Sequence, residues 1–410
     1  MSKLALKWIA GTSAATLISA ACFAEPTSDL VADQRETSPV EAEAETEAVD
    51  AEYADAVAVA QANGVVADSV VDTRLTVTQS LGDGTDGYGS ANATSSLTGA
   101  NVWGGALSTA TAQGNAVTGA FHAPAEVNLD QDARGPAAAS ALAELRLDDY
   151  SGAAQTQANA SANAAELYGE DSLDVYARQR FEGAVSATAN TVTTGQTESA
   201  TTSAVAAGNS LLVTGWDADP IVDVDQASHG EVAVLASSTH DALIHGAVVA
   251  AEGAGNTAKI QNDWGYAHMQ GVQSNTGGVQ VIAELNAADF GWGSGVAGAN
   301  AAGNSAVVSN IGADAYMGLD QNNSGAVSAS SSVSGAGGSA LIASASAFGN
   351  TQSAYICSEC PVGLDASANQ VNSGPVTARS RSVSSGHTPV VSSNATAVGN
   401  SLTFSNTAPQ

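Results

Sequence analysis

Basic and aromatic side chains are scarce in this chain of 410 residues. Lys and Arg number 11 against 41 Asp and Glu, which gives a formal net charge of −30, and Phe, Trp and Tyr together make up 5% of the chain. Nucleic acids and anionic lipids would repel such a protein, so the charge argues against both as partners. No apolar run is long enough to cross a bilayer as a helix.

Cysteine is almost absent. Beyond Cys22 only Cys357 and Cys360 remain, in the segment Cys357-Ser358-Glu359-Cys360. The sequence has no second cysteine pair, no histidine near this one and no βαβ pattern, so neither a zinc site nor a thioredoxin-like motif is indicated. In an exported protein the pair predicts a local disulfide that closes a loop.

The first 24 residues have the features of a secretory signal peptide. Lys3 and Lys7 precede an uncharged run over residues 8–21, and small residues stand before a cleavage point after Ala24. The alternative is a lipobox over residues 19–22, in which Cys22 would be lipidated. Both interpretations predict export, to the cell surface or the outer membrane.

The rest of the chain divides into two parts. Residues 25–70 are rich in Ala and Glu, as in Glu41-Ala42-Glu43-Ala44-Glu45-Thr46-Glu47. This composition can bury little apolar surface, so it predicts a disordered or loosely helical spacer. Residues 71–410 are expected to form one domain of tandem repeats.

Two landmarks define the repeat. The first is a glutamine that is followed four residues later by glycine, with successive glutamines 47–49 residues apart: Gln131, Gln179, Gln226, Gln273, Gln321 and Gln370. The second is an asparagine that ends an Ala/Ser-rich segment, at intervals of 46–50 residues: Asn115, Asn163, Asn209, Asn256, Asn304, Asn350 and Asn400. Gln79 opens a degenerate first unit, which makes about seven repeats.

The local pattern predicts an all-β fold. Small or apolar residues alternate with polar ones after each glycine, and the glycines divide each repeat into parts of 25 and 22 residues. We therefore predict a parallel β-solenoid with two turns per repeat, in which the Gln and Asn side chains stack as hydrogen-bonded ladders. Seven repeats would then give about 14 turns and a rod of about 65 Å. An antiparallel sheet array with the same repeat is the alternative.

Residues that could carry chemistry do not form a recognisable motif. The segment Gly82-Asp83-Gly84-Thr85-Asp86-Gly87 resembles a calcium-binding turn but occurs once, and Asp217-Ala218-Asp219-Pro220 is a second acidic turn. The six histidines have no metal-ligand spacing, and Gly293-Ser294-Gly295 lacks the strand and helix that flank a nucleophile. The sequence therefore predicts no catalytic site, no metal and no cofactor.

The aromatic residues near predicted loops are interpreted either as plugs of solenoid corners or as platforms for sugar rings: Trp103, Trp216, Trp264, Tyr266, Phe290 and Trp292.

The repeats resemble a known family. Its features here are an acidic, Ala-rich beginning and repeated Gly-Asn segments, namely Ala112-Gln113-Gly114-Asn115, Ala206-Ala207-Gly208-Asn209-Ser210, Ala302-Gly303-Asn304-Ser305 and Ala397-Val398-Gly399-Asn400-Ser401. They are similar to the HfaD type of holdfast anchor proteins from stalked Alphaproteobacteria. This resemblance implies a multimerising protein of the outer membrane that fastens the holdfast polysaccharide to the cell pole together with other anchor proteins. It implies no catalytic residues.

The expected function is therefore that of a surface anchor that associates with itself and binds an adhesive polysaccharide. A curlin-like, fibre-forming adhesin subunit is the first alternative, because stacked amide side chains can also template contacts between molecules. A β-helical carbohydrate-active enzyme is the second.

Overall fold

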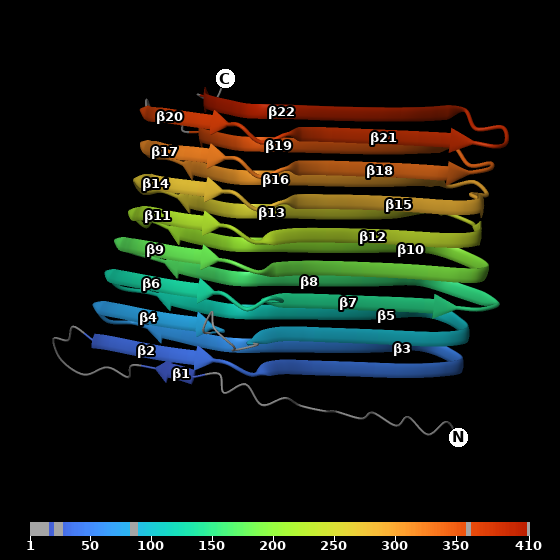
Figure 1. The fold of residues 1–410 in the computed structure, drawn as a ribbon, viewed down its shortest axis with the longest axis horizontal. Coiled ribbons are helices and arrows are strands. Elements are labelled where there is room, and N and C mark those ends of the chain that lie inside the picture. The colour runs from blue at the N-terminus through green and yellow to red at the C-terminus, as the bar shows by residue number, and fades with distance from the viewer. Residues whose placement is uncertain (1–15, 20–27, 83–88, 358–361, 408–410) are drawn as a thin grey trace.

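The computed structural model describes residues 16–19, 28–82, 89–357 and 362–407. These residues form 22 β-strands and no helix, and therefore no helix long and apolar enough to cross a membrane. Every strand pair among them is parallel. Figure 1 shows the strands stacked as successive coils, with the N-terminal coil at the bottom and the C-terminal coil at the top. The predicted parallel β-solenoid is confirmed, and the antiparallel array is wrong.

The first wall of the solenoid is an eight-stranded sheet with one strand of nine residues per coil. Its strands follow each other in chain order: β2 (Ser28–Glu36), β4 (Thr73–Leu81), β6 (Ala125–Ala133), β9 (Leu173–Phe181), β11 (Pro220–Ser228), β14 (Ala267–Asn275), β17 (Ala315–Asn323) and β20 (Leu364–Asn372).

The other two walls belong to a second sheet. The second wall holds β7 (Ala139–Leu147), β12 (Glu231–Leu243), β15 (Val279–Asp289), β18 (Val327–Gly335) and β21 (Val376–Ser384). The third wall holds β8 (Tyr150–Gly169), β13 (Gly246–Asp263), β16 (Ser294–Ile311), β19 (Ala340–Cys357) and β22 (Val390–Thr407). Three long strands supply both walls in their coils, namely β3 (Pro39–Ser69), β5 (Ser90–Phe121) and β10 (Ala184–Trp216).

Each repeat forms one coil. Residues that pair between neighbouring coils are a whole repeat apart, as are Gln179 and Gln226 on the first wall and Asn209 and Asn256 on the third. The predicted two turns per repeat is therefore wrong, because half of each repeat forms the first and second walls and the other half returns along the third. Eight coils at the usual strand spacing span about 38 Å, whereas an 18-residue strand spans about 60 Å. The solenoid is thus a flat block, wider than the stack is high (Figure 1).

The interior contains two separate hydrophobic cores. One lies between the second wall and the first halves of the third-wall strands, and the other between the first wall and their second halves. Along β16 the alternation of buried and outward residues shifts by one at Gly303 and Asn304, which are both buried. This shift keeps alanines facing inward on both sides of the strand's midpoint. Since alanine dominates, the walls approach closely and both cores are thin.

A column of glycines explains the recurrence of glycine after each glutamine. At Gly277 an added Cβ would lie 1.7 Å from the carbonyl oxygen of Gly230, and at Gly325 it would lie 1.8 Å from that of Gly277. The same clash with the preceding coil exists at Gly135, Gly183, Gly230 and Gly374. The chain turns here from the first wall to the second, and only glycine lets successive turns stack at this distance.

The expected disordered spacer is wrong for the part of it that the structure describes. Residues 28–36 and 39–69 form β2 and β3, which pair along their length with β4 and β5 and make up the first coil. Glu41, Glu43, Glu45 and Glu47 point outward, and the residues between them point inward. An acidic composition is compatible with a strand here because its period of two places every carboxylate in solvent. Thr16–Ser19, which fall inside the predicted signal peptide, form β1 and pair with Val65–Asp68 of β3.

The glycine column yields a stability prediction. Gly277→Ala places a methyl group against the backbone of the preceding coil, and overpacking of this kind costs about 1–3 kcal/mol or more. Gly278→Ala is the matched control, because no atom lies within 4 Å of its added Cβ. We expect chemical unfolding followed by circular dichroism to show a lower midpoint for G277A and an unchanged one for G278A. Equal midpoints would contradict the close approach of the coils.

Candidate functional surface

The predicted glutamines lie inside the solenoid as one continuous ladder. Each Gln Nε2 donates a hydrogen bond to the Oε1 of the glutamine in the preceding coil, over 2.7–2.9 Å, from Gln370 down to Gln79 and Gln34. The same Nε2 also donates across the interior to a third-wall carbonyl, as Gln226 does to Thr257 at 2.8 Å. The ladder therefore links coil to coil and wall to wall.

The predicted asparagines form a second ladder on the opposite wall. Each Asn Nδ2 donates to the Oδ1 of the asparagine in the following coil, over 2.7–2.8 Å, from Asn63 to Asn400. It also donates to a first-wall carbonyl, as Asn256 does to Ser274 at 2.8 Å. Since a backbone carbonyl can only accept, these cross-interior bonds assign the amide nitrogens. The two ladders consequently run in opposite directions.

Together the two ladders form a polar partition at the midline of the block. On one side lies the core that contains Ala299 and Ala301, and on the other the core that contains Ala306 and Val308. A buried amide is stable only when it is hydrogen-bonded, and these side chains satisfy one another at each coil. A slip of the stack by one residue would break the bonds of every amide at once, so the partition specifies the register.

Two further amide contacts were missed in the sequence. Asn275, Asn323 and Asn372 form a third ladder with bonds of 2.7 Å, and each also donates to the carbonyl of the glycine two residues later. Asn262 donates to Asn310 at 3.2 Å. The sequence does contain a signal for the third ladder, which is the pattern Gln-x-Asn in the last three repeats. At the position of this asparagine, earlier repeats have Leu81, Ala133, Phe181 and Ser228.

Several predicted features fall partly or wholly outside the described residues. The expected disulfide needs Cys360 and the alternative lipidation needs Cys22, and neither residue is described, although Cys357 lies at the end of β19. The Gly-Asp segment that resembles a calcium-binding turn also lies outside the described residues, except for Gly82. Asp217 and Asp219 are described and lie in the turn between β10 and β11. No group of three or more His, Cys, Asp and Glu side chains that could hold a metal ion occurs in the described parts of the chain.

One histidine is buried in the core. His240 on β12 lies between the hydroxyl groups of Thr193, which is 2.7 Å from Nδ1, and Ser238, which is 2.5 Å from Nε2. Burial lowers the pKa of His240 to about 4, because it penalises the charged imidazolium. The side chain is therefore neutral at pH 7 and packs as part of the interior.

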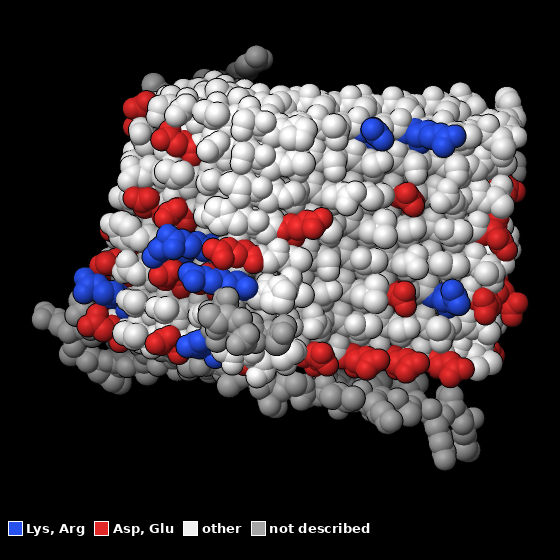
Figure 2. All heavy atoms as spheres, viewed as in Figure 1, with Lys and Arg blue, Asp and Glu red and all other residues white. Residues whose placement is uncertain are grey.

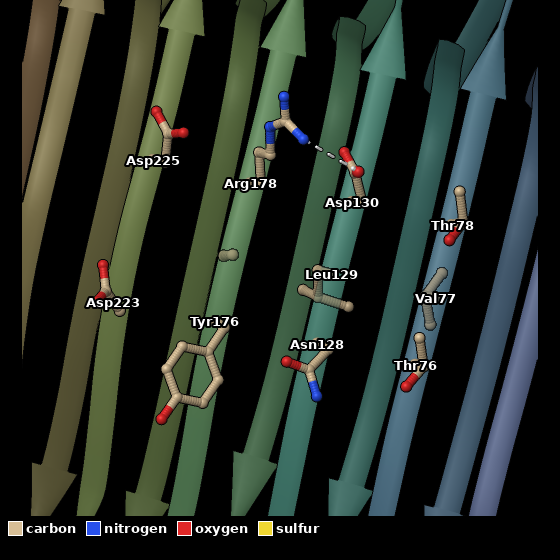
Figure 3. Close-up of a pocket in the computed structure, with 11 residues that line it drawn as sticks. Thr76, Val77, Thr78, Asn128, Leu129, Asp130, Tyr176, Arg178, Asp223 and Asp225 are labelled. Carbon is tan, nitrogen blue, oxygen red and sulfur yellow. Dashed lines mark ion pairs between the residues drawn. The ribbon is translucent and has the colours of Figure 1, made fainter.

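The first wall carries a shallow groove on its outer face. It has a volume of about 300 Å³ and spans β4, β6, β9 and β11. Figure 3 shows Tyr176 on β9 between the side chains of Asn128 and Asp223, from the preceding and following coils. Arg178 lies beside it in the next outward position, with an ion pair of 3.5 Å to Asp130.

The groove has the composition of a site for a polar, ring-shaped ligand. The Tyr176 side chain is half exposed, so its ring face is accessible. Carboxylate, amide and guanidinium groups around it can accept and donate hydrogen bonds. Asp130, Asp223 and Asp225 against Arg178 leave a net charge of −2, because three carboxylates face one guanidinium. The groove therefore suits an uncharged or cationic ligand.

The aromatic residues expected at corners divide into two groups. Phe290 is fully buried and plugs the corner between β15 and β16. Trp103, Trp216, Trp264, Tyr266 and Trp292 are exposed, Trp292 to 89%. Beyond the groove, Tyr266 meets the ring of His268 edge-on, and His268 stacks on Tyr316 with centroids 4.4 Å apart. These three rings lie on or beside the first wall, so aromatic side chains continue along this face, exposed at Tyr266 and partly buried at His268 and Tyr316.

A stack of uniform coils, with an amide-bonded interior and a polar outer face, defines a structural β-solenoid. The family model described as Holdfast attachment protein D matches residues 54–326 and 315–410. The chain therefore belongs to this family of structural adhesion proteins, which act at the cell envelope and are not enzymes. No curated protein and no solved structure matches it.

The ladder yields a second stability prediction. Gln226→Leu leaves Gln179 Oε1 without its donor and Gln273 Nε2 without its acceptor, both buried. Each unsatisfied buried group costs about 1–3 kcal/mol, so we expect a loss of at least about 2 kcal/mol. Gln280→Leu makes the same change at an exposed position of β15 and should leave the unfolding midpoint unchanged. Similar midpoints for Q226L and the unmodified chain would show that the ladder contributes little.

His240 yields a prediction on pH. Its pKa is lower in the folded state than the usual 6.5, so the unfolded chain binds the proton more tightly and stability falls as the pH drops from 6.5 towards 4. The shift corresponds to at most about 3 kcal/mol. Unfolding of the unmodified chain and of H240Q, measured at pH 7.5 and pH 4.5, should show a smaller acid-induced loss for H240Q. H387Q, at an exposed histidine, should keep the full loss, and an equal loss in all three would contradict the assignment.

Proposed function

We propose that this chain attaches the holdfast by binding its polysaccharide along the outer face of the first wall. Family membership supports a role in holdfast attachment. The groove around Tyr176 is the observation that supports the first wall as the binding face. A polymer needs an extended surface, and the stack of parallel strands supplies equivalent outward positions one coil apart.

The groove has the parts that sugar recognition requires. The apolar face of a pyranose ring packs on an exposed aromatic ring, and its hydroxyl groups bond to flanking polar side chains. Tyr176 supplies the ring, and Asn128 and Asp223 flank it at the spacing of the coils. Because the groove carries a net negative charge, the preferred polymer is neutral or contains amino sugars.

Further along the same wall, the His268 and Tyr316 rings extend the face to two more coils. In this stack the two ring faces pack against each other, so this part of the wall presents ring edges and the polar atoms of both side chains. A polysaccharide chain lying along the stack would therefore contact Tyr176 in the fourth coil and Tyr316 in the seventh.

The cellular context completes the proposal. The chain is exported by the predicted signal peptide of residues 1–24 and acts at the outer membrane near the cell pole. It works there with other holdfast anchor proteins and with copies of itself. In support of this self-association, the first and last coils each have a neighbouring coil on one side only within the described part of the chain.

Binding is tested with purified protein in affinity electrophoresis through three polymers: a neutral glucan, the amino-sugar polymer chitosan and the polyuronate alginate. We expect retardation by the glucan or chitosan and none by alginate. Tyr176→Ala should weaken retardation at least tenfold, because it removes the stacking platform. Tyr355→Ala, at an exposed tyrosine of the third wall, is the matched control and should bind normally.

The same variants test the role in cells. In a deletion strain, the unmodified gene and Y355A should restore attachment that resists washing, whereas Y176A should release adhesive material into the medium. Normal attachment by Y176A, or binding to no polymer in the gel, would overturn the assignment of this face.

A further inference from the structure

The C-terminal coil has no coil above it among the described residues. Strands β20, β21 and β22 pair only with β17, β18 and β19. Val391, Leu402 and Phe404 point inward but are 48%, 50% and 41% exposed, whereas their partners in the preceding coil are buried. A sheet edge with unpaired backbone groups and an open core is a template for another strand layer.

The N-terminal coil has a corresponding open edge. Strand β3 pairs with β5 on one side, and within the described chain only Val65–Asp68 have a partner on the other side, in β1. Glu41, Glu43, Glu45 and Glu47 stand along this edge in a row of exposed carboxylates. None of the ion pairs between described residues involves them.

The charges at the two ends are complementary and lie in the same columns of the second wall. When the strand pairing is followed through all eight coils, the column of outward residues that starts at Glu43 ends at Arg379. The column that starts at Glu45 ends at Arg381. Strand β21 carries no acidic residue. Figure 2 shows carboxylates in a row along the lower edge of this wall and basic side chains near its upper edge.

The amide ladders have a matching polarity. The Gln ladder donates towards the N-terminus, so it ends at the top with Gln370 Oε1, a buried acceptor that has no hydrogen-bond partner among the residues that the structure describes. The Asn ladder donates towards the C-terminus and ends at Asn400, whose Nδ2 donates to the Gln370 carbonyl at 3.2 Å and has no asparagine of a further coil beside it among the described residues. A next coil that continued both ladders would offer a glutamine donor and an asparagine acceptor, which are the residue types at Gln34 and Asn63 of the first coil.

We propose that copies of this chain stack head to tail, with the C-terminal coil of one on the N-terminal coil of the next, in the register that joins coils within each molecule. Arg379 then lies beside Glu43 of the second copy, Arg381 lies beside Glu45, and the Gln and Asn ladders continue across the junction. This inference rests on the self-association included in the proposed function and names the surfaces that perform it.

Export has a direct role in this assembly. Strand β1 occupies the part of the β3 edge at Val65–Asp68 and lies within the predicted signal peptide. Cleavage after Ala24 removes β1 and leaves that part of the edge accessible to a second copy. Stacking is therefore expected of the exported chain.

The test is sedimentation velocity of the protein purified from the cell envelope, without polysaccharide. We expect concentration-dependent oligomers that weaken as NaCl rises from 0.05 M to 0.5 M, because salt screens the ion pairs at the junction. The R379E/R381E variant and the E43R/E45R variant should each dissociate with a constant at least tenfold higher, since like charges then meet. Circular dichroism of each variant should match the unmodified chain.

Mixing the two variants separates a junction from general damage. In the mixture, each reversed end meets an end of opposite charge on the other variant, so association should return to the level of the unmodified chain. Oligomers that ignore both charge reversals, or a mixture that stays monomeric, would overturn this junction. An unmodified chain that is monomeric at every concentration would overturn self-association itself, while polysaccharide binding would be unaffected.

Discussion

The hydrogen bond between amide side chains of successive coils is the interaction on which the rest of this structure depends. The interior is built largely of alanine, which buries little area per residue, so apolar contact alone specifies register weakly. The Gln and Asn ladders supply that specificity, because each amide has one partner in the neighbouring coil and one on the opposite wall. They also explain why the interior has two cores: the polar partition occupies the midline.

The outer surface follows from the same register. Once equivalent residues lie in columns, side chains that are about 47 residues apart become neighbours, and the polar setting of Tyr176 is made from coils that flank its own. The groove therefore exists because the coils stack in register, and it requires no distortion of the coils. The two ends of the block follow as well, because a repeat that stacks on itself has no intrinsic final coil, and the acidic and basic residues at the ends determine what can be added.

Much of this architecture could be predicted from the sequence, in particular the positions of the amides. Gln131 to Gln370 and Asn115 to Asn400 keep one period, and only stacking explains two landmarks with the same spacing. The number of turns per repeat could not be predicted, because Gly208 and Gly230 divide the repeat nearly in half. Gly208 lies within the third-wall half of β10, and Gly230 lies in the next coil at the turn from the first wall to the second, so their spacing measures part of a single turn of the solenoid and not a full one.

The first coil and the groove were missed for related reasons. Gln34 and Gln79 are 45 residues apart and Asn63 and Asn115 are 52 apart, so an irregular spacing hid the first repeat within an acidic composition. The neighbours of Tyr176 could not be identified from the sequence. The prediction of one turn per half repeat places every residue beside the wrong residue of the neighbouring coil. Charge complementarity between Glu43 and Arg379 likewise appears only when the register is followed through all the coils.

One coil per repeat is the central claim, and engineered cysteine pairs test it most directly. Ser186 and Ala233 are direct partners on the second wall, and adjacent strands place Cα atoms at about 4.8 Å, within the range of a disulfide. S186C/A233C should therefore form a cross-link under mild oxidation, located by peptide mass mapping. S186C/S210C, half a repeat apart and on opposite walls, should form none, and a cross-link in this second pair but not in the first would contradict the account.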